Sequence, residues 1–175
     1  SAEQAGAKEV RLIHEPMAAA IGIGIDVLEP MGNMIVDIGG GTSEIAVIAL
    51  GGIVNNKSIR TAGDDFTSEI VEYMRKQHNM YIGERTAEMI KIEVGSALTE
   101  LDNPPDEYAV HGRDLLTGIP KEIKVNYSEI AYCLDKSISK IETAVLNALE
   151  QTPPELAADI YRTGIYLTGG GALLR

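Results

Sequence analysis

Val36-Asp37-Ile38-Gly39-Gly40-Gly41-Thr42-Ser43-Glu44 carries the strongest structural signal in this chain. Apolar runs at residues 33–36 and 45–50 flank it, so the pattern predicts two strands joined by a tight turn. Three consecutive glycines carry no Cβ, and the backbone N–H groups of such a turn can therefore crowd around an anion such as phosphate. Asp37 can hold Mg²⁺ through water, and the Thr42 hydroxyl can bond a phosphate oxygen. The signature of a helix-capped P-loop does not occur.

A second glycine triplet strengthens this interpretation. A triplet alone is weak evidence, because ordinary hairpin turns are also rich in glycine. Thr168-Gly169-Gly170-Gly171-Ala172, however, follows another apolar run at residues 164–167, in the order of a strand, a glycine turn and the start of a helix. Two junctions of this kind fit two edges of one nucleotide site better than two coincidental turns.

Composition limits the class of protein. The 175 residues suffice for one domain or two small ones, and a hydrophobic content of 45% allows a sizeable core. The net charge of −11, without a basic stripe, argues against nucleic acid as a partner. The single cysteine, Cys133, excludes an internal disulfide framework and is expected to be a core residue in a reducing compartment. No signal peptide or membrane-spanning stretch is recognised.

The first third of the chain predicts a strand, a helix and an antiparallel meander. The apolar run at residues 10–14 suits a strand, and Glu15-Pro16 then starts a helix that continues to Gly22. The meander strands are expected at about residues 33–38, 43–50 and 53–61. This arrangement differs from a doubly wound sheet, in which helices separate all the strands.

The rest of the sequence predicts an insertion, followed by a long helix and a last strand. A helix opens at Gly63, with Asp64 or Asp65 as its N-cap, and Asp64 is expected to cap rather than to touch a ligand. A second helix carries Ala87 and Leu98 on one face. The later elements are expected as strands at about 107–112 and 119–125, helices at about 128–151 and 155–162, and a last strand before Gly169. The order resembles half of an actin-like fold with an insertion.

Four motifs and their spacing identify a family. They are Leu12-Ile13-His14-Glu15-Pro16-Met17-Ala18-Ala19-Ala20-Ile21-Gly22, Asp37-Ile38-Gly39-Gly40-Gly41-Thr42, Ile82-Gly83-Glu84-Arg85-Thr86-Ala87-Glu88 and Leu167-Thr168-Gly169-Gly170-Gly171. Together they closely resemble the MreB family of bacterial actin homologues, over nearly the whole chain. The wider superfamily of actins, sugar kinases and DnaK-type chaperones shares the glycine hairpin but not the sequence between the motifs.

The resemblance implies a fold and a domain division. The fold would be an α/β, actin-like (ribonuclease H-like) ATPase domain, with a mixed sheet, an antiparallel meander flanked by helices, and an inserted smaller α+β subdomain. The core subdomain would comprise residues 1–61 and 127–175, and the inserted subdomain residues 62–126. The sequence, which begins without methionine and stops as a helix begins, is interpreted as a segment of a longer chain covering most of the second of two large domains.

The resemblance also implies a role for each matching position. Asp37 would hold Mg²⁺ through water, and Glu15 would orient the water that attacks ATP. Glu88 and Lys91 lie one helical turn apart on one face and would contact adenosine. The other nucleotide contacts would come from the two glycine turns: Gly40, Gly41 and Thr42, with Gly39 before them, at the β- and γ-phosphates, and Gly169, Gly170 and Gly171 beside the adenine and α-phosphate.

Several of these residues also have ordinary structural explanations. Without the family, Glu15 would be an acid stabilised at a helix start, and Glu88 with Lys91 would be a solvated pair. Asp37 is harder to explain in this way, because an acid in an apolar strand is costly unless it is paired or bound to metal. His78 and His111 are isolated and suggest no metal site.

The function implied by the family is that of a cytoskeletal ATPase. The full-length chain would bind Mg²⁺ with ATP or ADP in an interdomain cleft and assemble head to tail into filaments that direct cell shape and cell-wall synthesis. Its partners would be other copies of itself and morphogenesis proteins. It would be cytoplasmic, at the inner face of the membrane, with membrane contact only through the other half. Half a cleft positions reactants poorly, so this segment alone is expected to hydrolyse ATP negligibly.

Two other functions of the same superfamily remain open from the sequence. A small-molecule kinase would need an acid acting as base towards a substrate hydroxyl, and no such additional acid within a polar cluster is seen here. A chaperone-type ATPase would need a peptide-binding domain further along the chain. The length of the full protein separates two of these functions, because a chain of about two domains favours the filament protein and a long C-terminal β-rich extension favours the chaperone.

Overall fold

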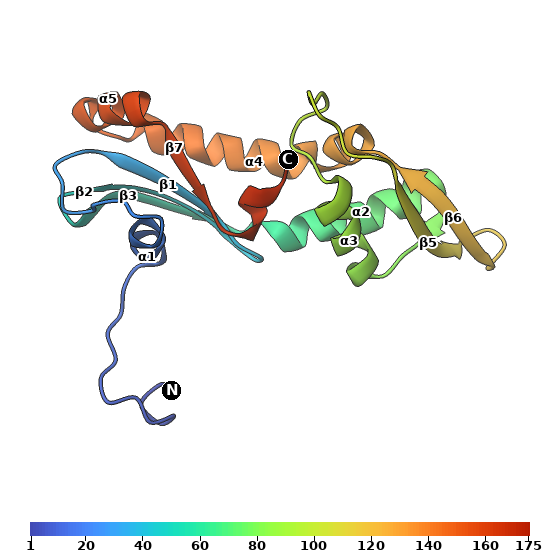
Figure 1. The fold of residues 1–175 in the computed structure, drawn as a ribbon, viewed down its shortest axis with the longest axis horizontal. Coiled ribbons are helices and arrows are strands. Elements are labelled where there is room, and N and C mark those ends of the chain that lie inside the picture. The colour runs from blue at the N-terminus through green and yellow to red at the C-terminus, as the bar shows by residue number, and fades with distance from the viewer.

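The computed structural model describes all residues from 1 to 175 and contains two β-sheets. The larger sheet has the strand order β3-β2-β1-β7 (Figure 1). Its strands are β1 (Asn33–Ile38), β2 (Ser43–Ala49), β3 (Gly52–Ile59) and β7 (Ile165–Thr168). The strands β1 to β3 form the predicted antiparallel meander, whereas β7 pairs with β1 in parallel, which confirms the predicted mixed sheet.

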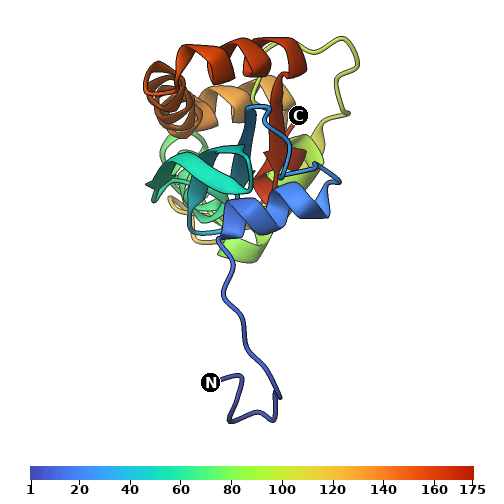
Figure 2. The same ribbon diagram turned by 90° about the vertical axis from the view of Figure 1, so that its left-hand side faces the viewer.

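Helices cover both faces of this sheet. Figure 2 shows α1 (Glu15–Gly22) on one face, with α4 (Tyr127–Glu150) and α5 (Pro154–Thr163) on the other. Side chains alternate between the faces of a strand, and β1 follows this rule. Val36 and Ile38 belong to the large cluster that includes α4, whereas Ile35 packs with Ala20 of α1. By the same alternation, Asp37 lies on the α1 face of the sheet.

The insertion builds a second layered unit. The helices α2 (Gly63–His78) and α3 (Glu84–Val94) pack beside a smaller antiparallel sheet with the order β4-β5-β6 (Figure 1). Its strands are β4 (Met80–Tyr81), β5 (Tyr108–Asp114) and β6 (Pro120–Val125). The strand β4 was not predicted, because two residues are too few to show the alternation that marks a strand.

Local hydrogen bonds explain where the longer helices begin. The Asn126 side chain accepts from Glu129 N at 2.9 Å and caps α4. At α2 the N-cap residue is Ala62, whose N–H donates to the Asp65 carboxylate at 3.0 Å. Neither Asp64 nor Asp65 is therefore the N-cap residue, and of the two acids it is Asp65 that closes this helix end.

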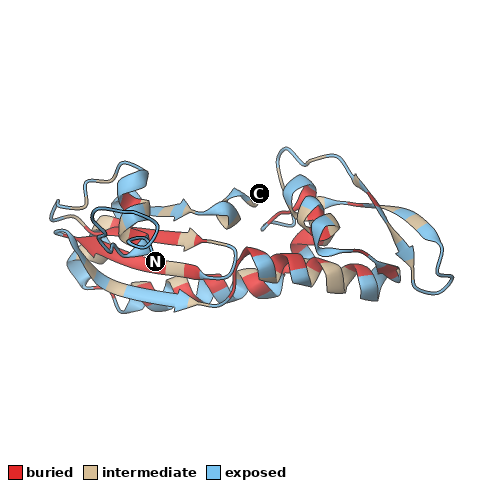
Figure 3. Cartoon of the chain, turned by 90° about the horizontal axis from the view of Figure 1, so that it is seen from below, coloured by how far each residue is buried: buried red, intermediate tan, exposed pale blue.

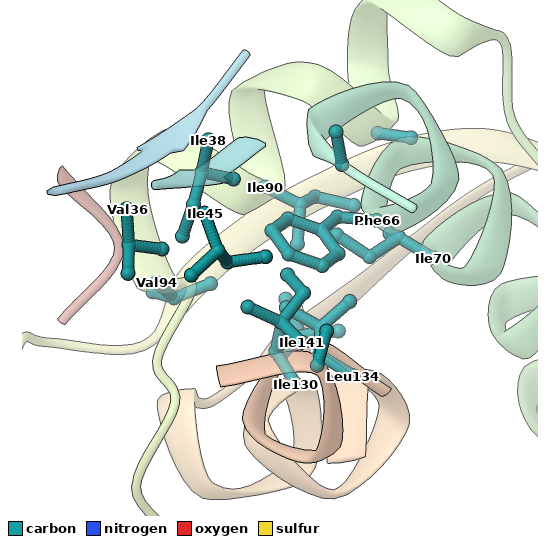
Figure 4. Packing of buried hydrophobic residues seen from close by; sticks show 14 of the residues in the cluster. Val36, Ile38, Ile45, Phe66, Ile70, Ile90, Val94, Ile130, Leu134 and Ile141 are labelled. Carbon is teal, nitrogen blue, oxygen red and sulfur yellow. The ribbon is translucent and has the colours of Figure 1, made fainter. Parts of the chain in front are cut away.

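One hydrophobic cluster extends through both layered units. Figure 3 shows the buried band running along α4, α2 and the larger sheet. Phe66 of α2 lies at its centre, between Ile38 and Ile45 of the sheet and Leu134 of α4 (Figure 4). Phe66 is 2% exposed. The α2 helix thus joins the insertion rigidly to the sheet that carries the first glycine turn.

Two expectations are wrong. Residues 10–14 form no strand, because neither edge of the larger sheet pairs with them, and Leu12 is 98% exposed. Leu98 lies beyond the helix that was expected to carry it. The α3 helix ends at Val94 and the chain turns at Gly95, where a Cβ would lie 2.7 Å from Leu174 Cδ1.

Cys133 lies half-buried on α4 and packs against the large hydrophobic cluster, in keeping with its expected place at the core. Burial, together with the carboxylates of Glu69 and Glu129, raises the pKa of its thiol to about 12. The thiol is therefore protonated and unreactive at neutral pH. None of the helices combines the length and apolar character that crossing a bilayer requires.

Candidate functional site

The two glycine turns meet at one cavity of about 400 Å³. The turn of residues 39–42 joins β1 to β2, and the second triplet follows β7, the parallel neighbour of β1. The parallel pairing therefore brings together two segments that lie about 130 residues apart in the sequence. Of the predicted nucleotide-binding residues, six line the cavity: Gly39, Gly40, Glu88, Lys91, Gly170 and Gly171.

The cavity wall combines polar and apolar groups. Beside the glycines of both turns, Gly63 and Asp64 at the start of α2 contribute backbone and carboxylate groups. The apolar part of the wall comes from α2, α3 and the C-terminal residues: Phe66, Ile92, Leu173 and Leu174. A volume of a few hundred Å³ with apolar walls and a few polar groups is usual for a small-molecule site.

The first glycine turn is held by its carbonyl groups. Gly63 N donates to Gly39 O at 3.0 Å, and Asp64 N donates to Gly40 O at 2.8 Å. The N–H groups of Gly40 and Gly41 donate to no other group of the chain. Because the α2 N-terminus occupies the carbonyls and leaves these two donors free, the turn presents N–H groups outward, as an anion-binding turn does.

The two triplets use glycine for different reasons. In the second turn Gly169 has φ +82°, and a Cβ on Gly171 would overlap Ile38 Cγ2. In the first turn no glycine has a positive φ, and a Cβ on Gly41 would meet nothing within 4 Å. Neither backbone conformation nor internal packing requires glycine at position 41, so the remaining reason is the approach of something outside the chain.

This difference predicts that alanine lowers stability at one position and leaves it almost unchanged at the other. Gly171→Ala is expected to lower the free energy of unfolding by about 1–3 kcal/mol, because its methyl group overpacks against Ile38. Gly41→Ala is expected to change it by less than about 0.5 kcal/mol. Urea unfolding of each variant, followed by circular dichroism, measures both. Equal losses in the two variants would contradict the packing described for Gly171.

Glu88 and Lys91 form a part-buried hydrogen-bond network with α2 rather than a free solvated pair. Lys91 Nζ lies 2.6 Å from Glu88 Oε2, and it also donates to Gly63 O at 3.0 Å and to Thr67 Oγ1 at 3.1 Å. The Lys91 side chain is only 15% exposed. Burial opposes ionisation of Glu88, but hydrogen bonds from Lys91 and Thr67 outweigh it and hold the pKa of this carboxyl below its usual value.

The sequence did not identify Asp64, which lines the cavity, or Thr67, which contacts the cavity residues Glu88 and Lys91. Asp64 was expected to cap α2 rather than to touch a ligand, yet its carboxylate lies against Gly40, 3.4 Å from the position of a Cβ there, and lines the cavity. Thr67 supports the Glu88–Lys91 pair from below. The only available signal was their position in the first turn of a helix that directly follows the meander.

Asp37 and Glu15 do not line the cavity. Asp37 lies on the α1 face of the sheet, opposite Glu44 of β2 in register, and Glu15 is the exposed first residue of α1 on the same face. Asp37 does adjoin the second turn, because a Cβ on Gly169 would lie 2.5 Å from Asp37 Oδ1. Gly41 and Thr42 are exposed at the tip of the hairpin turn, outside the cavity lining.

A second hollow, of about 600 Å³, differs in character. It lies between α4 and the larger sheet and is lined by apolar side chains such as Ile141, Val145 and Leu167. Gly171 is the only predicted site residue in its wall. Without a cluster of polar groups it offers no phosphate or metal contacts, so the cavity at the glycine turns is the candidate site.

Known proteins are similar to this chain over its whole length. The family model of the MreB/Mbl protein matches residues 1–175. The chain is 52% identical to the cell shape-determining protein MreB of Escherichia coli K12 over 178 aligned residues, with 100% of this chain and 50% of that protein covered. It is 48% identical to the cell shape-determining protein Mbl of Bacillus subtilis 168, with 99% and 52% covered. The chain thus spans about half the length of these curated relatives.

Solved structures agree with this assignment. MreB5 of Spiroplasma citri bound to ADP superposes with a TM-score of 0.95 at 44% identity, covering 99% of this chain and 52% of that one. The MamK filament, at 18% identity and a TM-score of 0.73, covers 99% of this chain and 50% of that one and shows the fold alone. The actin-like fold expected from the sequence is therefore confirmed, and the chain belongs to the MreB/Mbl family.

Proposed function

We propose that this chain carries half of the Mg-ATP site of an actin-like cytoskeletal ATPase. One observation carries the proposal: two glycine turns from neighbouring parallel strands meet at a single cavity whose wall also contains apolar side chains. The MreB5 relative of known structure is bound to AMPPNP or to ADP in two crystal structures, which supports a nucleotide as the ligand.

The first turn would bind the terminal phosphates. The N–H groups of Gly40 and Gly41 have no partner within the chain, and the N-terminus of α2 stands directly behind this turn. Helix N-termini and free backbone donors both attract phosphate oxygens. The exposed Thr42 hydroxyl adds a donor at the tip of the turn.

The apolar side chains of the cavity would contact the base. Ile92 and Leu174 offer hydrocarbon surface, and the second glycine turn lines the same cavity. Because Gly170 and Gly171 carry no Cβ, a planar ring can lie close to their backbone. Glu88 lines the cavity as well and would contact the ribose.

Asp37 fits a water-mediated magnesium contact. Its carboxylate forms no hydrogen bond or ion pair within the chain, and it faces a second carboxylate, that of Glu44, across the hairpin. Two like charges in directly opposed positions are unfavourable unless a cation lies near them. No group of three ligating side chains is present, so the protein would hold Mg²⁺ through water rather than in a closed cage. When bound, the ion neutralises charge that develops on the phosphates.

Glu15 would act on the α1 side of the same sheet end. It begins α1 and is exposed, so its carboxylate is free to orient a water molecule. Its position outside the cavity lining agrees with a role towards the terminal phosphate rather than towards the nucleoside. Hydrolysis also requires groups that close the cleft from the opposite side, and a chain spanning half of its relatives is therefore expected to turn over ATP negligibly alone.

We further propose that the chain divides into a core subdomain, residues 1–61 and 127–175, and an inserted subdomain, residues 62–126. The separate sheet of the insertion supports this division. The full-length protein would assemble head to tail in the cytoplasm, at the inner face of the membrane. It would direct cell shape there with partners of the cell-wall machinery. The filament of the MamK relative supports self-association.

Sedimentation of the full-length protein tests this function. The protein is centrifuged with Mg-ATP, with Mg-ADP or without nucleotide, and phosphate release is followed in parallel. We expect the pelleted fraction and the phosphate released to rise together only with ATP. A chain that stays soluble and hydrolyses ATP only after a small hydroxylated substrate is added would instead indicate a kinase.

A further inference from the structure

The contacts between α2 and α3 assign separate tasks to Glu88 and Lys91, which line the cavity, and to Thr67 of α2. The Lys91 ammonium group has three protein acceptors within reach: Gly63 O, Thr67 Oγ1 and Glu88 Oε2. A lysine that donates to all three has no hydrogen left for a ligand unless it breaks one of these contacts. Lys91 thus links the two helices, whereas the family resemblance implies a contact between Lys91 and adenosine.

Glu88 is held differently, because only one of its oxygens is engaged. Glu88 Oε2 receives the Thr67 hydroxyl at 2.6 Å and the Lys91 ammonium at 2.6 Å. Glu88 Oε1 accepts from no group of the chain, and 45% of the side chain is exposed at the cavity. An ionised carboxylate with one oxygen fixed and the other free is suited to accept a hydrogen bond from a ligand hydroxyl.

We propose that Thr67 is a positioning residue that fixes the carboxylate of Glu88, so that Glu88 Oε1 accepts a hydrogen bond from a ribose hydroxyl of the bound nucleotide. This inference rests on the proposed function. Thr67 is buried, and its hydroxyl also lies 3.0 Å from Gly63 O, whose own N–H holds the first glycine turn. The hydroxyl has one hydrogen, which goes to Glu88, so Thr67 is joined to Gly63 through Lys91, which donates to Thr67 Oγ1 and to Gly63 O.

Burial makes this arrangement specific for a hydroxyl group at position 67. Thr67 is 8% exposed, so a side chain of the same shape without the hydroxyl would leave Lys91 and Glu88 each short of one partner. Hydrogen bonds to charged groups are worth more than neutral ones, and a carboxylate that loses one can swing into solvent. Valine has this shape without the hydroxyl, whereas serine keeps the hydroxyl and lacks only the methyl group.

The test compares two ligands in the full-length protein. Thr67→Val is expected to weaken ATP binding about tenfold, while binding of inorganic tripolyphosphate, which has no ribose, stays within about twofold. Thr67→Ser is expected to restore ATP binding. Thr143→Val is the matched control, because the Thr143 hydroxyl makes the same bond to the carbonyl four residues earlier on the exposed side of α4. It is expected to leave both affinities unchanged.

The outcomes separate this inference from the proposed function. If wild-type protein binds neither ATP nor tripolyphosphate, both fail. If wild-type protein binds ATP and Thr67→Val binds it equally well, or loses ATP and tripolyphosphate to the same extent, only the positioning role is overturned. Circular dichroism checks the fold of each variant, and Thr67→Ala replaces Thr67→Val in the same comparison if the valine variant does not fold.

Discussion

Asp37→Ala is expected to abolish ATP-dependent phosphate release by the full-length protein, with a loss of about 100-fold or more. The carboxylate makes no hydrogen bond or ion pair within the chain and stands beside the second glycine turn, where a Cβ on Gly169 would lie 2.5 Å from it. Stabilising the charge on transferring phosphates is usually among the largest contributions to such reactions, so removal of a magnesium-holding group costs rate rather than stability. Steady-state phosphate release at saturating Mg-ATP measures the loss.

A matched acid provides the control. Asp135 on α4 is exposed and takes part in no hydrogen bond or ion pair of the chain, so Asp135→Ala removes the same charge away from the cavity. The Asp135→Ala protein is expected to release phosphate at the wild-type rate. In sedimentation with ATP, wild type and Asp135→Ala are expected to pellet, whereas Asp37→Ala is expected to stay in the supernatant. Wild-type turnover in Asp37→Ala, at any magnesium concentration, would show that the metal is held elsewhere.

Phe66→Ala is expected to lower stability more than a substitution at any other residue that lines the cavity. Phe66 is the largest fully buried side chain and connects α2 to the sheet and to α4 (Figure 4). Loss of a buried phenylalanine typically costs about 3–5 kcal/mol, because the void is only partly filled by relaxation. For a domain of 150–250 residues that corresponds to a melting temperature lower by about 6–20 °C. Phe66 also lines the cavity, so ATP affinity is expected to fall as well.

Thermal unfolding of the full-length protein, followed by circular dichroism with and without Mg-ATP, measures both effects. Tyr132→Ala is the control, because Tyr132 lies on α4 with 76% of its surface exposed and is expected to change the melting temperature little. A Phe66→Ala protein that melts within about 2 °C of wild type would contradict the central place of this side chain in the core.

The sequence predicted the elements well where the signal was local. The meander, the long α4 helix and the two glycine turns each carry a pattern of alternation, helical period or turn residues within a short window. The strand at residues 10–14 was wrong for a reason that no local pattern contains. An apolar run forms a strand only where it pairs with another strand. Neither edge strand of the larger sheet, β3 or β7, pairs with residues 10–14.

The residues that join α2 to α3 and to the first glycine turn were harder to predict than the glycine turns themselves. Thr67 looks like any polar residue in the first turns of a helix, and its role depends on Lys91 of another helix, 24 residues away. The same holds for Gly63, whose N–H bonds Gly39 and whose carbonyl bonds Lys91. Tertiary hydrogen bonds of this kind leave no periodicity in the sequence, and only the packing of α2 against α3 reveals them.

The most direct test of the nucleotide site is a calorimetric titration of the full-length protein with Mg-ATP, in wild-type form and as Gly41→Ala. Position 41 is open towards the outside and needs no glycine for its own conformation, so the variant is expected to fold as wild type does. We predict that wild-type protein binds Mg-ATP and that Gly41→Ala binds it at least about tenfold more weakly, because the added methyl group obstructs the approach of phosphate. Equal affinities in the two proteins would contradict the assignment of this turn as the phosphate site.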